Sequence, residues 1–300
     1  MEEVLSQRLA GPLPGGSPGA AVTLRPMRCG EMLAPPGFLR REDGLPGRLR
    51  ALGVGVDKSD QIWVPLPVFL VEHPTAGPIL IDTGAPASAA HDVKAAFGRL
   101  GAAIYNVRMR PEDAVAARLR ALEIDPLAIK TVVLTHLHLD HAGSIQEFPH
   151  AKFITTTRGW ESANAPRGFV RGYVKRQFEH AFDYRLIDYD APGINSFASF
   201  GRAFDLFGDG SITLVSTPGH SAGHQSVILR LSGREALICG DAAYTRQTIA
   251  DGTPPLILHD VHNFKRSLRE IRGYTQITPS ALVIAGHDRD EWERLDAFYD

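Results

Sequence analysis

The sequence predicts a mixed α/β fold. Short runs rich in β-branched and aromatic residues are interspersed with amphipathic helical segments, an order that fits neither an all-β protein nor a strict βαβ alternation. The chain has 300 residues, of which 44% are hydrophobic, so it can bury a substantial core. Histidine and aspartate follow several of the predicted strands, and loops at strand ends converge in space, so we expect these side chains to share one site.

Residues 1–20 are predicted to be a flexible leader, and residues 21–300 a single domain. The stretch GPLPGGSPG at residues 11–19 is rich in glycine, proline and serine and can bury little surface. We expect the leader to be loose or draped over the domain, and we assign no chemistry to it. No internal repeat is visible along the chain.

The composition points to a small-molecule partner. The 32 basic and 34 acidic residues give a net charge of -2 without long runs of either sign, which argues against nucleic-acid or membrane-surface binding. Cys29 and Cys239 are the only cysteines, so a disulfide framework is not expected and a reducing cytoplasm fits best. The N-terminus resembles no secretory signal, and no apolar run approaches the ~20 residues of a membrane-spanning helix.

Strands and helices are predicted from hydrophobic patterning. Residues 62–83 indicate two strands joined by a turn at residues 74–78, and Pro65 and Pro67 favour an edge or bulged strand there. Residues 111–124 and 263–271 are expected to be helices, the first with proline at its start and acidic residues in its first turn. Further strands are expected at residues 130–134, 152–156, 212–216, 225–231, 236–239 and 281–285.

The segment THLHLDHAG at residues 135–143 carries the strongest chemical signal. In an extended chain His136, His138 and Asp140 would point to one side, and a turn would bring His141 to the same region. Imidazole and carboxylate groups are natural ligands of zinc and similar ions. Four such groups within six positions can hardly all bind one ion, so the pattern favours two ions.

Three further donors follow later strands. His220, Asp241 and His287 each come after a predicted strand and a turn containing glycine, which lets the chain bend toward a shared cleft. His224 is a candidate support for these ligands. The remaining histidines are interpreted as solvated or satisfied in the core: His73, His91, His150, His180, His259 and His262. A turn or cap role is the alternative for the aspartates Asp82, Asp241 and Asp260.

The string His-x-His-x-Asp-His at residues 136–141, with the three later donors, resembles the metallo-β-lactamase superfamily from about Pro67 to His287. The resemblance implies a four-layer αββα fold with two metal ions at the edge of a β-sandwich. It implies that one ion is held by His136, His138 and His220. It implies that the other is held by Asp140, His141 and His287, with Asp241 bridging the ions and Asp82 supporting the ligands.

The motifs THLHLDHAGS, TPGHSAGHQSVIL, GDAAYT and AGHD are most similar to the N-acyl homoserine lactone lactonases of this superfamily. That branch carries a tyrosine three residues after the bridging aspartate, which here is Tyr244. The resemblance implies that Tyr244 donates a hydrogen bond to the substrate, whereas an ordinary packed tyrosine is the alternative. Residues 1–60 and 167–200 depart from the compact members of the branch, so substrate preference could differ there.

The activity implied is opening of the lactone ring by a hydroxide that bridges two divalent cations. Tyr244 and one ion would polarise the carbonyl, and Asp140 could return a proton to the leaving oxygen. Zinc is the default ion, while Mn, Co and Fe accept the same ligands. Candidate walls of a groove for an acyl tail are the aromatic residues Phe169, Tyr173, Phe178, Phe182, Tyr184, Tyr189, Phe197 and Phe200, for which core or dimer packing is the alternative.

Other functions fit parts of the pattern. A thioesterase of the glyoxalase II type shares the bridging aspartate, and an oxygen-reducing diiron protein is disfavoured by His138. β-Lactam hydrolysis is disfavoured because a bridging aspartate is typical of the other branches. A scaffold that only binds metal is the alternative outside enzymes. No Gly-x-Ser-x-Gly motif supports a serine nucleophile, and the sequence leaves a homodimer open.

Overall fold

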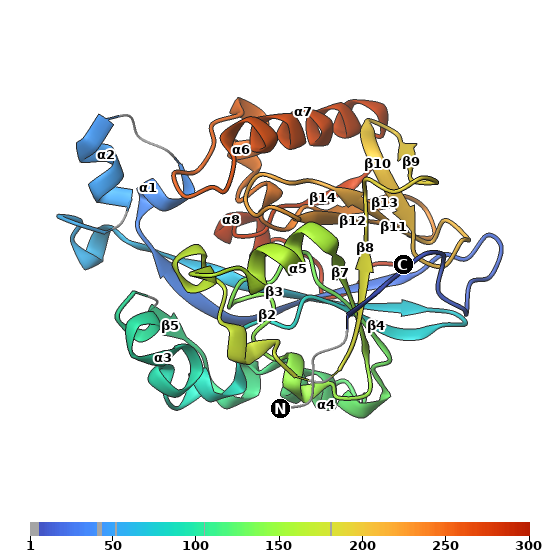
Figure 1. Ribbon diagram of the computed structural model, residues 1–300, viewed down its shortest axis with the longest axis horizontal. Helices are drawn as coiled ribbons and strands as arrows, with labels where there is room; N and C mark the ends of the chain where they lie inside the picture. The colour runs from blue at the N-terminus through green and yellow to red at the C-terminus, as the bar shows by residue number, and fades with distance from the viewer. Residues whose placement is uncertain (1–5, 41–43, 52, 105, 181) are drawn as a thin grey trace.

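The computed structural model describes residues 6–40, 44–51, 53–104, 106–180 and 182–300, which form two β-sheets with helices on their outer faces (Figure 1). The first sheet has eight strands in the order β1-β8-β7-β6-β4-β3-β2-β5. These are β1 (Ser6–Arg8), β2 (Thr23–Ala34), β3 (Ile62–His73), β4 (Gly77–Ile81), β5 (Asn106–Arg108), β6 (Thr131–Val133), β7 (Lys152–Thr156) and β8 (Asp183–Ile187).

The second sheet has six strands in the order β14-β13-β12-β11-β10-β9. These are β9 (Asn195–Phe197), β10 (Phe200–Asp205), β11 (Ile212–Ser216), β12 (Gln225–Arg230), β13 (Glu235–Ile238) and β14 (Leu282–Ile284). The helices are α1 (Pro36–Leu39), α2 (Gly44–Ala51), α3 (Val93–Ile104), α4 (Val115–Ala121), α5 (Thr157–Asn164), α6 (Arg246–Asp251), α7 (Val261–Ile277) and α8 (Arg289–Trp292).

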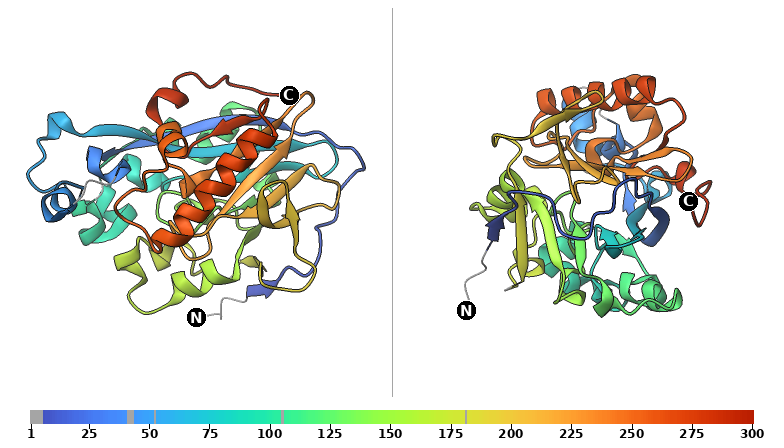
Figure 2. Two further views of the ribbon diagram at one scale, coloured as in Figure 1. Left: turned by 90° about the horizontal axis from the view of Figure 1, so that it is seen from above. Right: turned by 90° about the vertical axis from the view of Figure 1, so that its right-hand side faces the viewer.

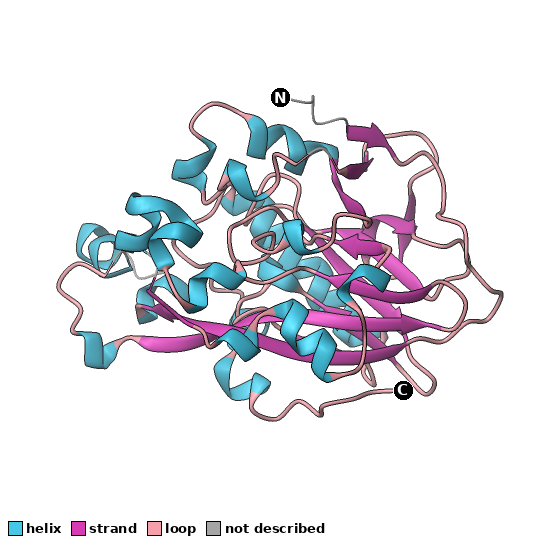
Figure 3. Cartoon of the chain, turned by 90° about the horizontal axis from the view of Figure 1, so that it is seen from below, coloured by secondary structure: helices cyan, strands magenta, loops and turns pink. Residues whose placement is uncertain are grey.

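Three apolar clusters define four layers, as the resemblance implies. Phe69 and Val71 of β3 pack against Leu214 of β11 and Val227 of β12 in a core between the sheets. The outer face of the first sheet packs on α4 and α5, and that of the second sheet packs on α7. Figure 2 shows the two sheets between the two helical layers. Figure 3 views the molecule from below and distinguishes helices from strands by colour.

The strand pairings bring the chemically active segments to one edge. In the first sheet Ile81 pairs with Val133 in parallel register, so the residues that follow β4 and β6 leave the sheet side by side. In the second sheet Ile238 pairs with Ile284, also in parallel. Asp241 and His287 each lie three residues beyond this last pair, so both side chains arrive at the same edge.

The interpretation of Pro65 and Pro67 as marks of an edge strand is wrong, and the predicted bulge is found. Their strand β3 is internal, with β4 on one side and β2 on the other. The pairing of β2 shifts between Arg28 and Glu31, opposite the two prolines. An extra residue in β2 therefore interrupts the ladder where proline offers no N–H donor.

Residues 6–20 are draped over the domain with defined partners, and residues 1–5 lie outside the described residues. Strand β1 pairs in parallel with β8, and Leu13 is 8% exposed in the core between the sheets. The backbone N–H of Ser17 donates to Asp209, and Thr75 donates to the carbonyl of Gly15. The glycine- and proline-rich composition of this segment thus did not predict its strand pairing and hydrogen bonds with the domain.

Most predicted elements are confirmed, with altered ends. The turn at residues 74–78 joins β3 and β4, and the helix predicted at residues 263–271 extends over Val261–Ile277. The helix predicted at residues 111–124 is a 3-10 turn at Pro111–Asp113 followed by α4. The sequence interpretation missed several elements, among them β2, β8, β10, α3 and α5. No helix in the described ranges is long and apolar enough to cross a membrane.

Candidate metal centre

Seven side chains that can bind metal meet at the edge where the two sheets face each other. Four come from the loop after β6, and the others follow β11, β13 and β14. Within them, donor atoms of three groups of three residues lie within 4.8 Å of one another. These groups are His136, His138 and His220; His136, His141 and Asp241; and Asp140, His141 and His287.

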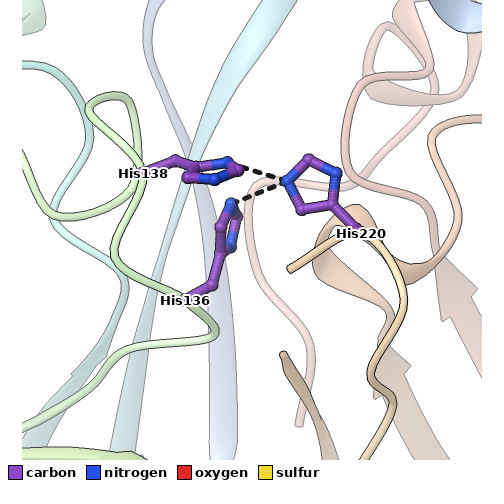
Figure 4. A group of neighbouring side chains, drawn as sticks. All are labelled: His136, His138 and His220. Carbon is purple, nitrogen blue, oxygen red and sulfur yellow. Dashed lines mark hydrogen bonds between the residues drawn. The ribbon is translucent and has the colours of Figure 1, made fainter. Parts of the chain in front are cut away.

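The first cluster consists of three histidines (Figure 4). His220 Nε2 lies 3.1 Å from His136 Nε2 and 2.8 Å from His138 Nδ1. His136 and His138 come from one segment of the chain, and His220 approaches from the opposite side. Gly219, with φ +138°, makes this approach feasible, because a Cβ atom there would lie 2.2 Å from the backbone nitrogen of Phe264.

The second cluster lies on the other side of Asp241. Asp140 Oδ2 is 3.7 Å from His141 Nε2 and 3.8 Å from His287 Nε2. The Nδ1 atom of His287 donates to the carbonyl oxygen of Pro65 at 2.9 Å, which directs Nε2 into the cluster. The three side chains thus offer one oxygen and two nitrogens to a common point.

Asp241 lies between the two clusters and faces each with a different oxygen. Its Oδ2 is 3.3 Å from His220 Nε2 and 3.9 Å from His136 Nε2. Its Oδ1 is 3.3 Å from His141 Nε2 and 3.2 Å from His287 Nε2. One carboxylate is therefore placed to serve both clusters.

The donor set fits two divalent cations. His141 Nε2 and Asp241 Oδ1 are buried and have no hydrogen-bond partner among the described residues, which is unfavourable unless a ligand satisfies them. The ring nitrogens of the first cluster face one another within hydrogen-bond distance, and a cation would satisfy their lone pairs together. Imidazole and carboxylate ligands suit zinc and other divalent first-row ions.

Burial keeps three of the histidine donors neutral, whereas the carboxylate of Asp241 raises the pKa of His141 and His287. Burial lowers the pKa of His136 and His220 well below the usual histidine value and that of His138 to about 4, so these rings are neutral at neutral pH. Burial opposes ionisation of Asp241, but the neighbouring His287, His141 and His220 outweigh it and lower the pKa of this carboxyl. Neutral imidazole and ionised carboxylate are the forms that bind metal.

Asp82 supports the ligands from behind, as the resemblance implies. Its carboxylate accepts a hydrogen bond from His141 Nδ1 at 2.8 Å and two from the backbone N–H and hydroxyl of Thr135. The Thr135 hydroxyl lies 3.1 Å from His136 Nδ1. Because Nδ1 of each ring is engaged in this network, Nε2 of both His136 and His141 is directed into the site.

Substitution of Asp82 by asparagine is expected to lower metal affinity about 10- to 100-fold, because the negative charge that supports His141 is lost. Titration of metal-free protein with Zn²⁺ measures the change. The exposed Asp92, which caps the start of α3 through the backbone of Lys94 and Ala95, supplies a matched Asp92→Asn control. Equal affinities in the two variants would contradict a supporting role for Asp82.

His224 is a support and not a ligand. Its Nε2 accepts a hydrogen bond from the backbone N–H of Asp241 at 2.9 Å, and its Nδ1 lies 2.9 Å from the hydroxyl of Thr217. Burial lowers its pKa to about 3, which keeps the ring neutral and able to accept. The other histidines contribute nothing to the clusters: His73 is paired with Asp209, the ring of His180 stacks on Phe182, and His91, His150, His259 and His262 are exposed.

Tyr244 borders the first cluster. Its hydroxyl oxygen lies 3.0 Å from His220 Nδ1, and its ring stacks on Phe38 of α1 with centroids 5.5 Å apart. Since His220 points Nε2 into the cluster, Nδ1 carries the hydrogen and donates to the phenol oxygen. This contact and the stacking on Phe38 fix the position of the phenol beside the first cluster.

The aromatic residues expected to line a groove lie in two kinds of environment, the apolar core and the walls of cavities. Phe178, Tyr184 and Phe200 are fully buried in the clusters on the outer faces of the sheets, and the Tyr189 hydroxyl donates to Gln225. Phe182 and Phe197 pack against these same clusters. Phe169 and Tyr173 line the cavity beside α3, and Tyr189 lines a separate pocket. The groove prediction fails for the other five, Phe178, Phe182, Tyr184, Phe197 and Phe200, which take the alternative of core packing.

The sequence analysis did not predict two aromatic contacts with the site. Tyr173 packs on His138 with ring centroids 4.9 Å apart, and Phe38 covers Tyr244. Gly172, with φ +90°, lies close to the same histidine, because a Cβ atom there would be 3.1 Å from the ring. No local pattern marks these residues, since each reaches the site from a separate loop or short helix.

A four-layer αββα fold with paired histidine and aspartate clusters at one edge defines a class of metal-dependent hydrolases. A model of the metallo-beta-lactamase superfamily matches residues 63–287. The chain therefore belongs to the metallo-β-lactamase superfamily. Within it, the chain is related to the N-acyl homoserine lactonases.

Sequence relatives establish that relation. The chain is 35% identical over 245 residues to the N-acyl homoserine lactonase AttM of Azorhizobium caulinodans. The match covers 79% of this chain and 88% of the relative. It is 34% identical to AttM of Agrobacterium fabrum over 76% of this chain and 84% of that protein. An N-acyl homoserine lactonase of Bacillus cereus is 29% identical over 78% of this chain and 86% of its own length.

Solved structures share the fold. One is an N-acyl homoserine lactone hydrolase with the product N-hexanoyl-L-homoserine bound at its catalytic metal centre. It matches with a TM-score of 0.73 and 21% sequence identity, and the match covers 91% of this chain and 96% of that chain. Another is AidC, a dizinc quorum-quenching lactonase, with a TM-score of 0.61 and 13% identity, over 92% and 91% of the chains. At these identities the comparison establishes the fold.

Proposed function

We propose that this hydrolase opens the lactone ring of N-acyl homoserine lactones with two divalent metal ions, zinc by default. The observation that carries the proposal is the position of Asp241, whose two oxygens face separate clusters at 3.2–3.9 Å. The relatives named above share both the fold and the lactonase activity given by their names. A ligand set that is complete and supported by Asp82 argues against a decayed site or a bare scaffold.

The first cluster would hold one ion through His136, His138 and His220. The second would hold the other through Asp140, His141 and His287, and Asp241 would serve both. Two cations held there would activate water and polarise the carbonyl of the substrate.

The protein side chains do the rest of the chemistry. The Tyr244 phenol, oriented by His220 and by its stacking on Phe38, would donate a hydrogen bond to the carbonyl oxygen as negative charge develops on it. Asp140 is 8% exposed, the most open of the acidic groups of the site, and would take and return the proton during ring opening. The burial of the other ligands apart from the half-buried His138 limits access of bulk water and would strengthen each electrostatic interaction.

Hydrolysis of a homoserine lactone series with increasing acyl length, compared with hydrolysis of S-lactoylglutathione, tests the substrate class. We expect kcat/KM to be larger for the lactones by at least two orders of magnitude. A preference for the thioester would instead assign the protein to the glyoxalase II type, which shares a bridging aspartate. The metal-loaded protein is used in both arms, so that an empty site cannot be mistaken for a lack of activity.

A further inference from the structure

A cavity of about 570 Å³ lies between α3 and residues 163–176. This volume is within the range of small-molecule binding sites. Its apolar walls are Phe97, Ala163, Phe169, Tyr173 and Val174. An aliphatic chain can therefore be accommodated there.

The cavity lies one layer of side chains from the metal centre. Tyr173 forms part of its wall and packs with its ring on His138. Phe97 and Val174 belong to the same apolar cluster as Tyr244, which borders the other side of the site. A substrate with its reacting carbonyl at the clusters could therefore extend an apolar tail toward this cavity.

The charges around the cavity are all of one sign. Arg167, Lys175 and Arg176 line it, and no acidic residue of the described ranges does. Arg176 is occupied, since its guanidinium donates to the carbonyl of Ala95 in α3 at 2.9 Å. Arg167 and Lys175 are exposed and make no ion pair with any carboxylate that the structure describes.

We propose that this cavity holds the tail of the substrate and that Arg167 and Lys175 select tails ending in an anionic group, such as a carboxylate. The inference rests on the proposed function and narrows its substrate class. A neutral acyl chain needs only the apolar walls, so it gains nothing from two unpaired cations. A tail with a terminal anion contacts both the apolar walls and the two cations.

Binding of octane-1-sulfonate, compared with octan-1-ol, tests the site without any turnover. The two probes share the alkyl chain and differ in charge, and sulfonate oxygens bind divalent cations weakly, so the metal centre contributes little. By isothermal titration calorimetry of the metal-loaded protein, we expect the sulfonate to bind about tenfold more tightly than the alcohol. Added salt should reduce this difference, because the cations are exposed.

The double variant Arg167→Gln/Lys175→Gln should remove the preference for the sulfonate and leave octan-1-ol binding unchanged. The matched control Arg120→Gln/Lys265→Gln removes the same net charge from two exposed residues that do not line the cavity, and it should keep the preference. Equal binding of the two probes by the wild type, or an equal loss in both double variants, would overturn the inference.

A kinetic arm separates this inference from the proposed function. Homoserine lactones with neutral acyl tails are compared with lactones whose tails of equal length end in a carboxylate. A higher kcat/KM for the carboxylated tail, lost in Arg167→Gln/Lys175→Gln, supports the inference. Hydrolysis of both substrates without a charge preference would overturn it and leave the proposed function intact. Charge-dependent sulfonate binding without any lactone hydrolysis would instead overturn the proposed function.

Discussion

Substitution of Asp241 by asparagine is expected to remove both metal ions and to abolish hydrolysis. The two oxygens of this carboxylate face different clusters, so its negative charge supports both sites at once. An amide has the same shape but no charge, and without that charge each cluster loses an anionic ligand. Elemental analysis of the purified variant after dialysis measures the ions retained per chain.

Two variants serve as controls for this experiment. Asp260→Asn changes an aspartate that caps α7 through the backbone of His262 and Asn263, and it should retain the wild-type metal content. His287→Gln should lose only the ion of the second cluster, because His287 contacts Asp140 and Asp241 but not the first cluster. A variant Asp241→Asn that keeps one fully occupied site would contradict the bridging role.

Substitution of Tyr244 by phenylalanine should leave metal content unchanged and reduce lactone turnover by up to ~10²-fold. The aromatic ring keeps its stacking on Phe38, so the change removes only the hydroxyl that contacts His220. If the phenol stabilises the developing oxyanion, the effect falls on kcat. Steady-state kinetics together with metal analysis of the same sample check both parts.

The buried Tyr274 provides the matched control. Its hydroxyl donates to Glu235, and its ring packs in the apolar cluster on the outer face of the second sheet, so Tyr274→Phe should leave kcat unaltered. An unaltered rate for Tyr244→Phe would return Tyr244 to a packing role. Loss of metal from Tyr244→Phe would show instead that the phenol acts by orienting His220.

The convergence of the seven donors was predictable because their positions follow local patterns in the sequence. Four of the seven donors lie within six positions after a short apolar strand, and the other three follow strands. The parallel register of β13 and β14 then places Asp241 and His287 at the same distance beyond their strands. Alternation and strand ends, which are visible in a single sequence, thus determine which side chains can meet.

The surroundings of the site depended on tertiary contacts and were missed or misjudged. Phe38 comes from a four-residue helix after β2, and Tyr173 follows a short 3-10 turn; neither segment has a hydrophobic period long enough to be recognised. The aromatic residues at 178–200 were expected in a groove, but sheet faces compete for the same side chains and bury them. Composition alone does not separate these environments.

The prolines of β3 also show that the sequence pattern of one strand does not reveal which strands pair with it. Proline lacks an N–H donor, which correctly predicts an interrupted ladder. Whether the interruption lies at an edge or against a bulged neighbour depends on the strand that pairs with it, and β2 was not recognised in the sequence. The position of β3 inside the sheet therefore could not be predicted.

Metal stoichiometry tests the central claim most directly. Protein purified without added chelator and saturated with Zn²⁺ is dialysed, and its zinc content per chain is measured by elemental analysis. The seven converging donors predict two ions per chain. A saturated content of one ion per chain, or none, would contradict the account.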